Sequence, residues 1–165
     1  MAIPKSISEL TRAVFAYCNA LTAAYTDNVK KLVRSCFQDC SSLTTLNTDN
    51  MEEVGDVSFY NCSDLREINL PKVEKIGNNV FYNTSSLTKV TIGQNCRSID
   101  TSGLHCGATT NKCTFYFEGT TPPTIQSRTF DETKLNKIIV PSGCGNIYKT
   151  ATNWANFASY IEEAI

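Results

Sequence analysis

Nucleophilic side chains are the first candidates for chemistry in this chain, which contains eight cysteines and a single histidine. His105 and Cys106 are adjacent, and a thiol beside an imidazole base can act as a nucleophile. The side chains of neighbouring residues usually diverge, however, and Cys106 also belongs to a repeating pattern that favours burial. We therefore expect no catalytic residue at this pair.

The sequence likewise indicates neither a metal site nor a pair of residues for acid–base catalysis. A structural zinc site needs four ligands at matching spacings, and the chain contains no Cys-x-x-Cys pair. The adjacent carboxylates Glu52–Glu53 and Glu162–Glu163 are typical of solvated corners and chain ends. No glycine-rich motif of the kind that holds phosphate is present. The sequence thus predicts no enzyme, no metal site and no cofactor.

The cysteines follow a constant interval instead of the clustered spacing of a disulfide framework. One position of a 22-residue period is filled by cysteine in four copies and by threonine in one: Cys18, Cys40, Cys62, Thr84 and Cys106. A position that accepts either residue favours a small buried side chain over a covalent partner. The interpretation is a reduced, buried ladder. Cys96, Cys113 and Cys144 lie outside this ladder. Whether two of these three form a disulfide bond is left open.

The same period governs the large apolar residues. A fixed period of this length indicates one structural unit that is copied and stacked, so that each copy covers the apolar face of its neighbour. We therefore expect equivalent residues to lie above one another in the interior. The predicted core consists of Phe15, Phe37, Phe59, Phe81, Cys18, Cys40, Cys62, Leu43, Leu65 and Leu87.

The copy that begins at Phe59 indicates how each unit folds. Ile68 and Leu70 alternate with polar residues, which is the periodicity of a strand. Pro71 ends this strand because proline cannot donate a hydrogen bond to a ladder. Residues 61–64 are a cluster of turn-forming residues at which the chain reverses. Each coil is thus expected to hold one strand and a second short extended segment, separated by two corners.

The run Phe-x-x-Cys-x-x-Leu-x-x-Ile-x-Leu-Pro from Phe59 to Pro71 resembles the BspA-like leucine-rich repeat family. Residues 73–77 and the terminal segment 140–154 extend the resemblance, which covers about residues 15–165. It implies a β-rich α/β fold, a right-handed leucine-rich-repeat solenoid of about 22-residue coils with a C-terminal capping helix. Many members of that family are bacterial surface or secreted proteins that bind host proteins or other cells, and others are encoded by phages or protists.

One domain is expected over residues 1–165. Its predicted parts are an N-terminal cap or partial repeat, regular repeats, irregular repeats and a C-terminal cap, at residues 1–14, 15–99, 100–141 and 142–165.

Two segments outside the regular repeats carry predictions of their own. Cys113–Phe117 is a strand candidate because of its aromatic content. From Asn146 onward, apolar residues recur about every 3.6 residues, which predicts an amphipathic helix that covers the last coil. The role of residues 100–112 stays open between a functional insertion and a degraded copy of the repeat.

The composition limits the partners and the compartment. The formal net charge is −1 and no run of five like charges occurs, which argues against a nucleic-acid partner. No apolar run approaches the roughly 20 residues of a membrane helix, so no membrane insertion is expected. Residues 1–9 do not resemble a secretory signal. The location is therefore extracellular or at the cell surface, by resemblance, if a leader has been removed, and otherwise cytoplasmic or phage-associated.

The function is predicted from the residues that face outward. If Leu65, Ile68 and Leu70 point inward, the polar residues between them stack into exposed columns of the kind on which solenoids bind partners. The candidate binding residues are Tyr25, Asn47, Asn69, Thr91, Thr44, Arg66 and Thr88. The leading hypothesis is a non-catalytic module that binds protein or glycan. The alternative is a structural spacer or assembly subunit of a cell envelope or phage, without a small ligand.

Overall fold

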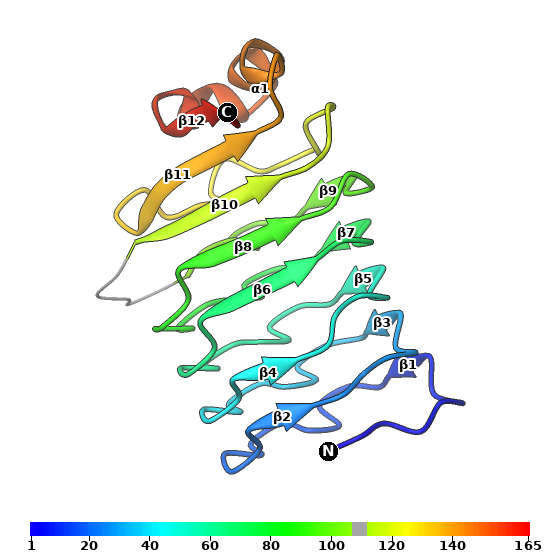
Figure 1. Cartoon of the computed structure of the whole chain (residues 1–165). Helices are drawn as coiled ribbons and strands as arrows, with labels where there is room; N and C mark the ends of the chain where they lie inside the picture. The colour runs from blue at the N-terminus through cyan, green and yellow to red at the C-terminus, as the bar shows by residue number, and fades with distance from the viewer. Residues whose placement is uncertain (107–111) are drawn as a thin grey trace.

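The chain folds as a parallel β-solenoid of about seven turns of about 22 residues, which confirms the predicted fold class. The structure, a computed structural model, describes residues 1–106 and 112–165. Part of the segment whose role stayed open, residues 107–111, lies outside the described residues. The coils stack from the N-terminus at one end to a small helical cap at the other (Figure 1).

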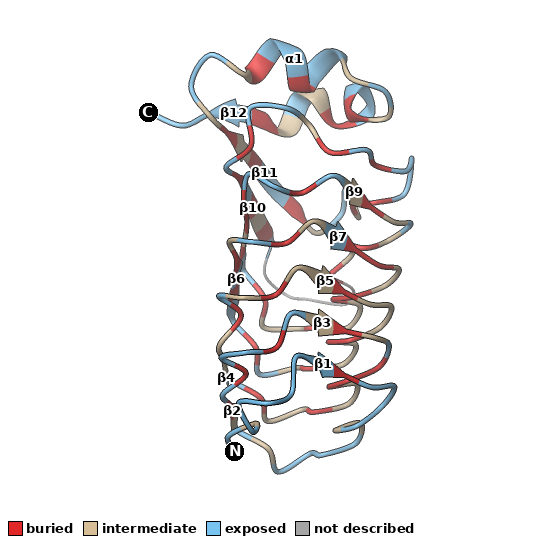
Figure 2. Cartoon of the chain, turned by 90° about the vertical axis from the view of Figure 1, so that its right-hand side faces the viewer, coloured by how far each residue is buried: buried red, intermediate tan, exposed pale blue. Residues whose placement is uncertain are grey.

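Two columns of strands run along the stack and form two faces (Figures 1 and 2). The broad face consists of β2 (Ala23–Ala24), β4 (Thr45–Leu46), β6 (Glu67–Leu70), β8 (Lys89–Ile92), β10 (Cys113–Phe117), β11 (Leu135–Val140) and β12 (Ile161–Glu163). The narrow face consists of β1 (Glu9–Leu10), β3 (Lys31–Leu32), β5 (Glu53–Val54), β7 (Lys75–Ile76) and β9 (Ser98–Ile99). The strand predicted at Cys113–Phe117 is therefore confirmed as β10.

Residues at equivalent positions of successive repeats lie side by side on neighbouring strands. All four residues of β6 pair in parallel with the residues of β8 that follow them by 22 positions. Successive side chains of a strand point to opposite sides. The second and fourth residues of β6 are accordingly buried, whereas the first and third are exposed. The inward and outward positions of this strand are those that the sequence predicted.

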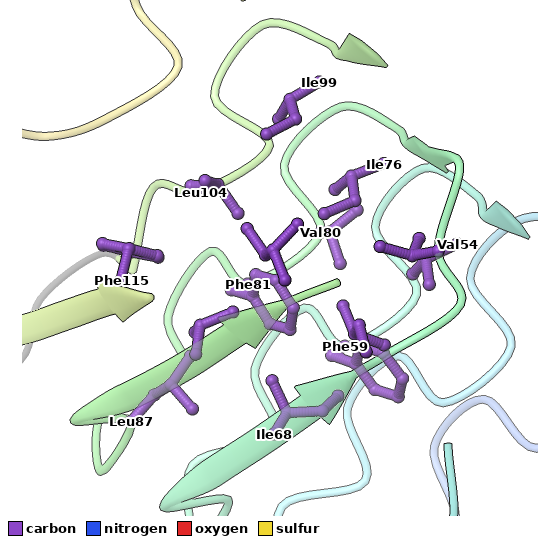
Figure 3. Packing of buried hydrophobic residues seen from close by; sticks show 14 of the residues in the cluster. Val54, Phe59, Ile68, Ile76, Val80, Phe81, Leu87, Ile99, Leu104 and Phe115 are labelled. Atoms are coloured by element: carbon purple, nitrogen blue, oxygen red, sulfur yellow. The ribbon is translucent and has the colours of Figure 1, made fainter. Parts of the chain in front are cut away.

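The phenylalanine rings form one file through the interior. The centroids of Phe15 and Phe37 are 5.4 Å apart, those of Phe37 and Phe59 are 5.9 Å apart, and those of Phe59 and Phe81 are 5.8 Å apart. The last two pairs have interplanar angles of 9°. Figure 3 shows Phe59 and Phe81 among the aliphatic side chains that surround them. Each regular coil thus has one phenylalanine ring at its centre, and this ring stacks on the equivalent ring of the next coil.

The cysteine and threonine side chains of the ladder also form hydrogen bonds between coils. The Cys62 thiol donates a hydrogen bond to the Phe37 carbonyl at 3.1 Å, and the Thr84 hydroxyl lies 3.1 Å from the Phe59 carbonyl. The Cys40 thiol makes the same contact with the carbonyl of the first phenylalanine in the file, also at 3.1 Å. Each side chain therefore connects its own coil to the preceding one. This explains why threonine replaces cysteine here, since both are small and both can donate.

The first coil departs from this pattern. Cys18 is exposed and Phe15 is only partly buried, so the prediction of a buried Cys18 is wrong. The reason is that no coil of the described chain lies beneath this one, which leaves the thiol without a carbonyl of a preceding coil. Residues 1–3 cover only the edge of β2, where the Ile3 amide donates to the Tyr25 carbonyl at 3.0 Å.

The C-terminal cap is helical, but it is shorter and more broken than the expected helix. It consists of α1 (Gly145–Thr150) and a 3₁₀ helix, η1 (Trp154–Tyr160), which lie across the end of the stack (Figure 2). Asn153 separates them with a φ of 66°, a left-handed conformation that ends a regular helix. After η1 the chain becomes β12, in which Ile161 pairs with Ile138 of β11. The cap thus also covers the last strand edge.

Large aromatic side chains attach the cap to the last coils. The Trp154 and Phe117 ring centroids are 5.1 Å apart, and those of Phe157 and Phe130 are 5.0 Å apart. The buried polar tips have partners: the Trp154 indole donates to the Pro123 carbonyl at 2.8 Å, and the Tyr148 hydroxyl donates to the Gly119 carbonyl at 2.8 Å. The apolar end of the solenoid is therefore closed by a second aromatic cluster.

The ring file generates a stability prediction. Phe59→Ala should lower the free energy of unfolding by about 3–5 kcal/mol, because it removes a ring from the file and leaves a cavity. Thr44→Ala, at an exposed position of the broad face, should change it by less than about 0.5 kcal/mol. Urea unfolding of both variants measures the difference. Equal and small effects would contradict the inward and outward assignment.

The cap generates a prediction about acid. The Gly143 and Gly145 amides each donate to the Glu163 carboxylate at 2.8 Å, and these bonds lower the pKa of Glu163. A carboxyl whose pKa is lower in the folded state stabilises that state at neutral pH, and the contribution is lost as the pH falls through the folded pKa. Glu163→Gln should therefore lower the melting temperature at neutral pH and have little effect at strongly acidic pH.

Glu162→Gln is the matched control for that change. Glu162 lies next in sequence but pairs with Lys137 at 2.7 Å on the exposed surface, where an ion pair contributes little to stability. Thermal unfolding followed by circular dichroism at both pH values compares the two variants. An effect of Glu163→Gln that does not change with pH would contradict a stabilising role for the ionised carboxylate.

Candidate functional site

The narrow face is covered by ion pairs that connect successive coils. In each of four pairs, a charged side chain meets an opposite charge one repeat further on. The pairs are Lys30–Glu52 at 2.8 Å, Lys31–Glu53 at 2.9 Å, Glu74–Arg97 at 3.7 Å and Lys75–Asp100 at 3.8 Å. Because these charges compensate one another within the face, little net charge is left there to attract a charged partner.

The broad face is mainly neutral and polar, and it holds the candidate binding residues. Thr44, Arg66, Thr88 and Asn69 are exposed, as is Tyr25, whose side chain is 50% exposed. The two others are partly buried: Asn47 and Thr91. The predicted columns therefore exist, although their members are not equally accessible.

The sheet of the broad face is interrupted between β4 and β6. Within the described chain, β4 pairs only with β2 and β6 pairs only with β8, so neither strand has a sheet partner on the side that faces this break. In the preceding coils the Asn47 amide donates to the Ala24 carbonyl at 3.3 Å. The equivalent groups at the interruption are the Asn69 amide and the Leu46 carbonyl, and their strands β6 and β4 are not paired in a sheet. The ladder of the broad face is thus broken between these two strands.

Threonine side chains accompany the short strands next to the interruption. Thr48 occupies the position that Leu70 and Ile92 occupy in the next two coils, and its hydroxyl donates to the Asn69 carbonyl. The Thr26 hydroxyl donates in the same way to the Asn47 carbonyl one coil earlier, where β2 and β4 do pair, so this bond alone does not cause the break. A short hydroxyl side chain that bonds to the backbone competes with a regular ladder. β4 is accordingly two residues long, whereas β6 and β8 have four residues each.

A groove lies over the interruption, with a volume of about 690 Å³. It runs from β4 across β6 and β8 to the end of β10, and its walls carry hydroxyls, amides and a few charges. The lining residues are Thr44, Thr45, Leu46, Asn47, Thr48, Asp49, Glu67, Ile68, Asn69, Lys89, Thr91 and Glu118. Four of the candidate residues meet here: Thr44, Asn47, Asn69 and Thr91. Tyr25, Arg66 and Thr88 do not line the groove.

A smaller apolar hollow of about 350 Å³ continues the groove toward the cap. Its side chains include Tyr116, Ile139 and Pro141, and it shares Lys89 and Thr91 with the groove. Sequence reasoning missed Tyr116, which is 37% exposed. The signal was present, because it stands between two phenylalanines of a strand whose alternate residues face the core. The groove therefore ends at an aromatic ring.

Tyr116 already has a cationic neighbour. The Lys89 ammonium lies 5.5 Å from the centroid of its ring, within the range of a cation–π interaction. The ammonium lies over the ring, and Tyr116 nevertheless remains 37% exposed. Such a ring is a surface on which a flat apolar group can stack.

The histidine and its neighbouring cysteine are not arranged as a nucleophile and base. The His105 ring stacks on Tyr82 with centroids 5.2 Å apart, and its Nε2 lies 3.4 Å from a carboxylate oxygen of Asp131. A hydrogen bond with the Cys113 thiol, together with burial, raises the pKa of Cys106. No group of three or more His, Cys, Asp or Glu side chains in the described part of the chain is placed to hold a metal ion.

All eight cysteines are described by the structure, and all are free thiols. Burial raises the pKa of Cys40 to about 11 and that of Cys96 to about 12. It also raises the pKa of Cys62. The thiolate is the reactive form of cysteine. The ladder cysteines beyond the first coil are thus unreactive packing residues, and Cys18 is the accessible one.

Comparison with known proteins agrees with this architecture. A model of the BspA-type leucine-rich repeat region, with six copies, matches residues 1–108 and 45–158. A leucine-rich cell surface protein from Faecalibacterium prausnitzii is similar in structure, with a TM-score of 0.71 and 26% identity over 84% of this chain and 38% of that one. Among curated proteins, none matches the chain significantly.

Two more distant solved structures show the same fold. The pneumococcal vaccine antigen PcpA is similar with a TM-score of 0.76 and 18% identity, over 99% of this chain and 39% of that one. A leucine-rich repeat protein from Bacteroides ovatus has a TM-score of 0.71 and 20% identity, over 100% of this chain and 42% of that one. The chain spans less than half the length of each of these three proteins. No helix that the structure describes is long and apolar enough to cross a membrane.

The thiols generate a prediction about reactivity. In native protein at neutral pH, a maleimide should label Cys18 first and Cys144, which is partly buried, more slowly. Cys40 and Cys62 should react only after a denaturant is added, because both are buried and their raised pKa leaves almost no thiolate. Mass spectrometry of labelled peptides gives the order, and Cys18→Ser should remove the fast phase. Prompt labelling of Cys62 in folded protein would contradict its position in the interior.

Proposed function

Because the chain belongs to the BspA-type leucine-rich repeat family, we propose that it is a non-catalytic binding module whose broad face recognises a protein or glycan partner. The repeat-protein fold is typical of binding and interaction modules, and the family is generally non-enzymatic. Extended faces of stacked repeats are the surfaces that solenoids use for binding.

The observation that carries the proposal is the groove over the interrupted sheet. The narrow face is bonded to itself through ion pairs between successive coils. The broad face instead combines a large concave surface with a break in its sheet and an exposed aromatic ring. Concave surfaces with convergent polar groups are the usual place for a ligand. A structural spacer, the alternative function, would need the stacked coils but not this groove.

The similar solved structures also support a location outside the cell or at its surface. The Faecalibacterium prausnitzii protein is described as a cell surface protein, and it is 26% identical to this chain. We propose that this module likewise works outside the cell or at its surface, where a protein or glycan of another cell is accessible. The free ladder thiols beyond Cys18 are compatible with that location, because their burial in the stack keeps them from oxidation.

A binding screen with one variant on each face tests the proposal. Purified protein is applied to immobilised extracellular-matrix proteins and to a glycan array, and every positive probe is titrated. Asn69→Lys places a long cationic side chain in the groove and should weaken binding at least about tenfold. Gln126→Lys makes the same change in charge at an exposed loop position away from the groove and should leave binding intact. Equal loss or equal retention in both variants would argue against the broad face.

A further inference from the structure

We propose that the groove between β4 and β6 is a glycan-binding site, in which a short neutral oligosaccharide lies across β4, β6 and β8 and stacks one sugar ring on Tyr116. The inference rests on the proposed binding function of the broad face and names the class of its ligand.

The interrupted ladder is the first reason. The Asn69 amide and the Leu46 carbonyl belong to two strands that do not pair, whereas the equivalent groups one coil earlier are joined at 3.3 Å. A polar group that loses its ladder partner must find another donor or acceptor. A sugar hydroxyl is both a donor and an acceptor, so the same kind of group can satisfy the amide of one strand and the carbonyl of the other.

The interruption is too narrow to admit a peptide strand, which favours a ligand with hydroxyl groups. Insertion of a strand would require β4 and β6 to stand about 9.5 Å apart, twice the usual spacing. The two coils are connected at both ends of the break, since the Asp64 amide donates to the Ser41 carbonyl at 3.1 Å and the Thr48 hydroxyl donates to the Asn69 carbonyl. A ligand therefore lies over the interruption and reaches into it with small polar groups.

The side chains of the groove match the two surfaces of a sugar ring. Thr45, Asn69 and Thr91 offer neutral donors and acceptors along the floor and walls. Tyr116 offers an exposed ring at the end of the groove, where the surface becomes apolar. The hydroxyl edge of a sugar suits the first part, and its flat C–H face suits the second. From β4 to β10 the groove spans three strand spacings, about 14 Å, which is the scale of a short oligosaccharide.

The charge of the groove argues for a neutral glycan. Asp49, Glu67 and Glu118 contribute three carboxylates, and Lys89 contributes the one ammonium among the lining residues. None of these three carboxylates forms an ion pair among the described residues. Sialylated or sulfated glycans would meet net negative charge here. Carboxylates accept hydrogen bonds from neutral hydroxyls without that repulsion.

The test is a glycan array of neutral oligosaccharides of glucose, galactose, mannose and N-acetylglucosamine, together with sialylated and sulfated sets. The best neutral probe is then titrated by isothermal titration calorimetry against four proteins. These are the native chain, Tyr116→Ala, Asn69→Ala and a matched control, Tyr17→Ala. Tyr17 is 67% exposed and does not line the groove, so its change also removes a tyrosine ring from the surface.

The expected result is binding of neutral probes that weakens at least about tenfold in Tyr116→Ala and Asn69→Ala and stays unchanged in Tyr17→Ala. Circular dichroism melting of each variant shows that the fold is retained. Preference for anionic glycans, or neutral binding that survives both groove changes, would overturn the glycan site. If the chain binds a protein through the broad face and no glycan, the glycan site is wrong and the binding module stands. If no probe of either class binds, both are wrong.

Discussion

Each coil of this protein must satisfy the backbone groups of the coil beside it, and the corners show what this requires. Asp39, Asn61 and Asn83 all have a φ of 59°, in the left-handed region that asparagine and aspartate tolerate best. In this conformation the Asp39 amide donates to the Tyr60 carbonyl and the Asn61 amide to the Tyr82 carbonyl, both at 2.8 Å. Hydrogen bonds at the corners therefore fix the length of the repeat, and equal positions fall above one another as a consequence.

The packing of the interior and the structure of the two ends follow from that constraint. Once the corners are aligned, rings such as Phe37 and Phe59 stack, and the thiol of Cys62 reaches the carbonyl of the coil before it. The same dependence on a neighbour explains the ends. Cys18 has no described coil beneath it and is exposed, whereas at the other end Trp154 and the strand β12 replace the missing neighbour.

The two faces use the aligned positions differently. On the narrow face, positions such as Lys31 and Glu53 alternate in charge, so that stacking forms ion pairs that stay within the face. On the broad face the outward positions are mainly hydroxyls and amides, some of which, such as Thr44 and Thr88, donate to the backbone of the preceding coil. The interruption beside Thr48 then opens a groove in a surface that would otherwise be a flat sheet. Regular stacking thus builds the scaffold, and one irregular coil gives it a candidate site.

The period of the sequence determined the fold, the ring file and the inward and outward positions of β6, because these depend on spacing alone. It also located four of the residues that line the groove, including Asn47 and Asn69. It could not locate the groove itself, since the groove lies where two neighbouring coils fail to pair, and the spacing of equivalent residues does not show which coils pair. The broken helix of the cap and the exposure of Cys18 and Tyr116 likewise depend on which neighbours are present. Spacing specifies which residues are equivalent, and only the assembled stack decides which of them meet a partner.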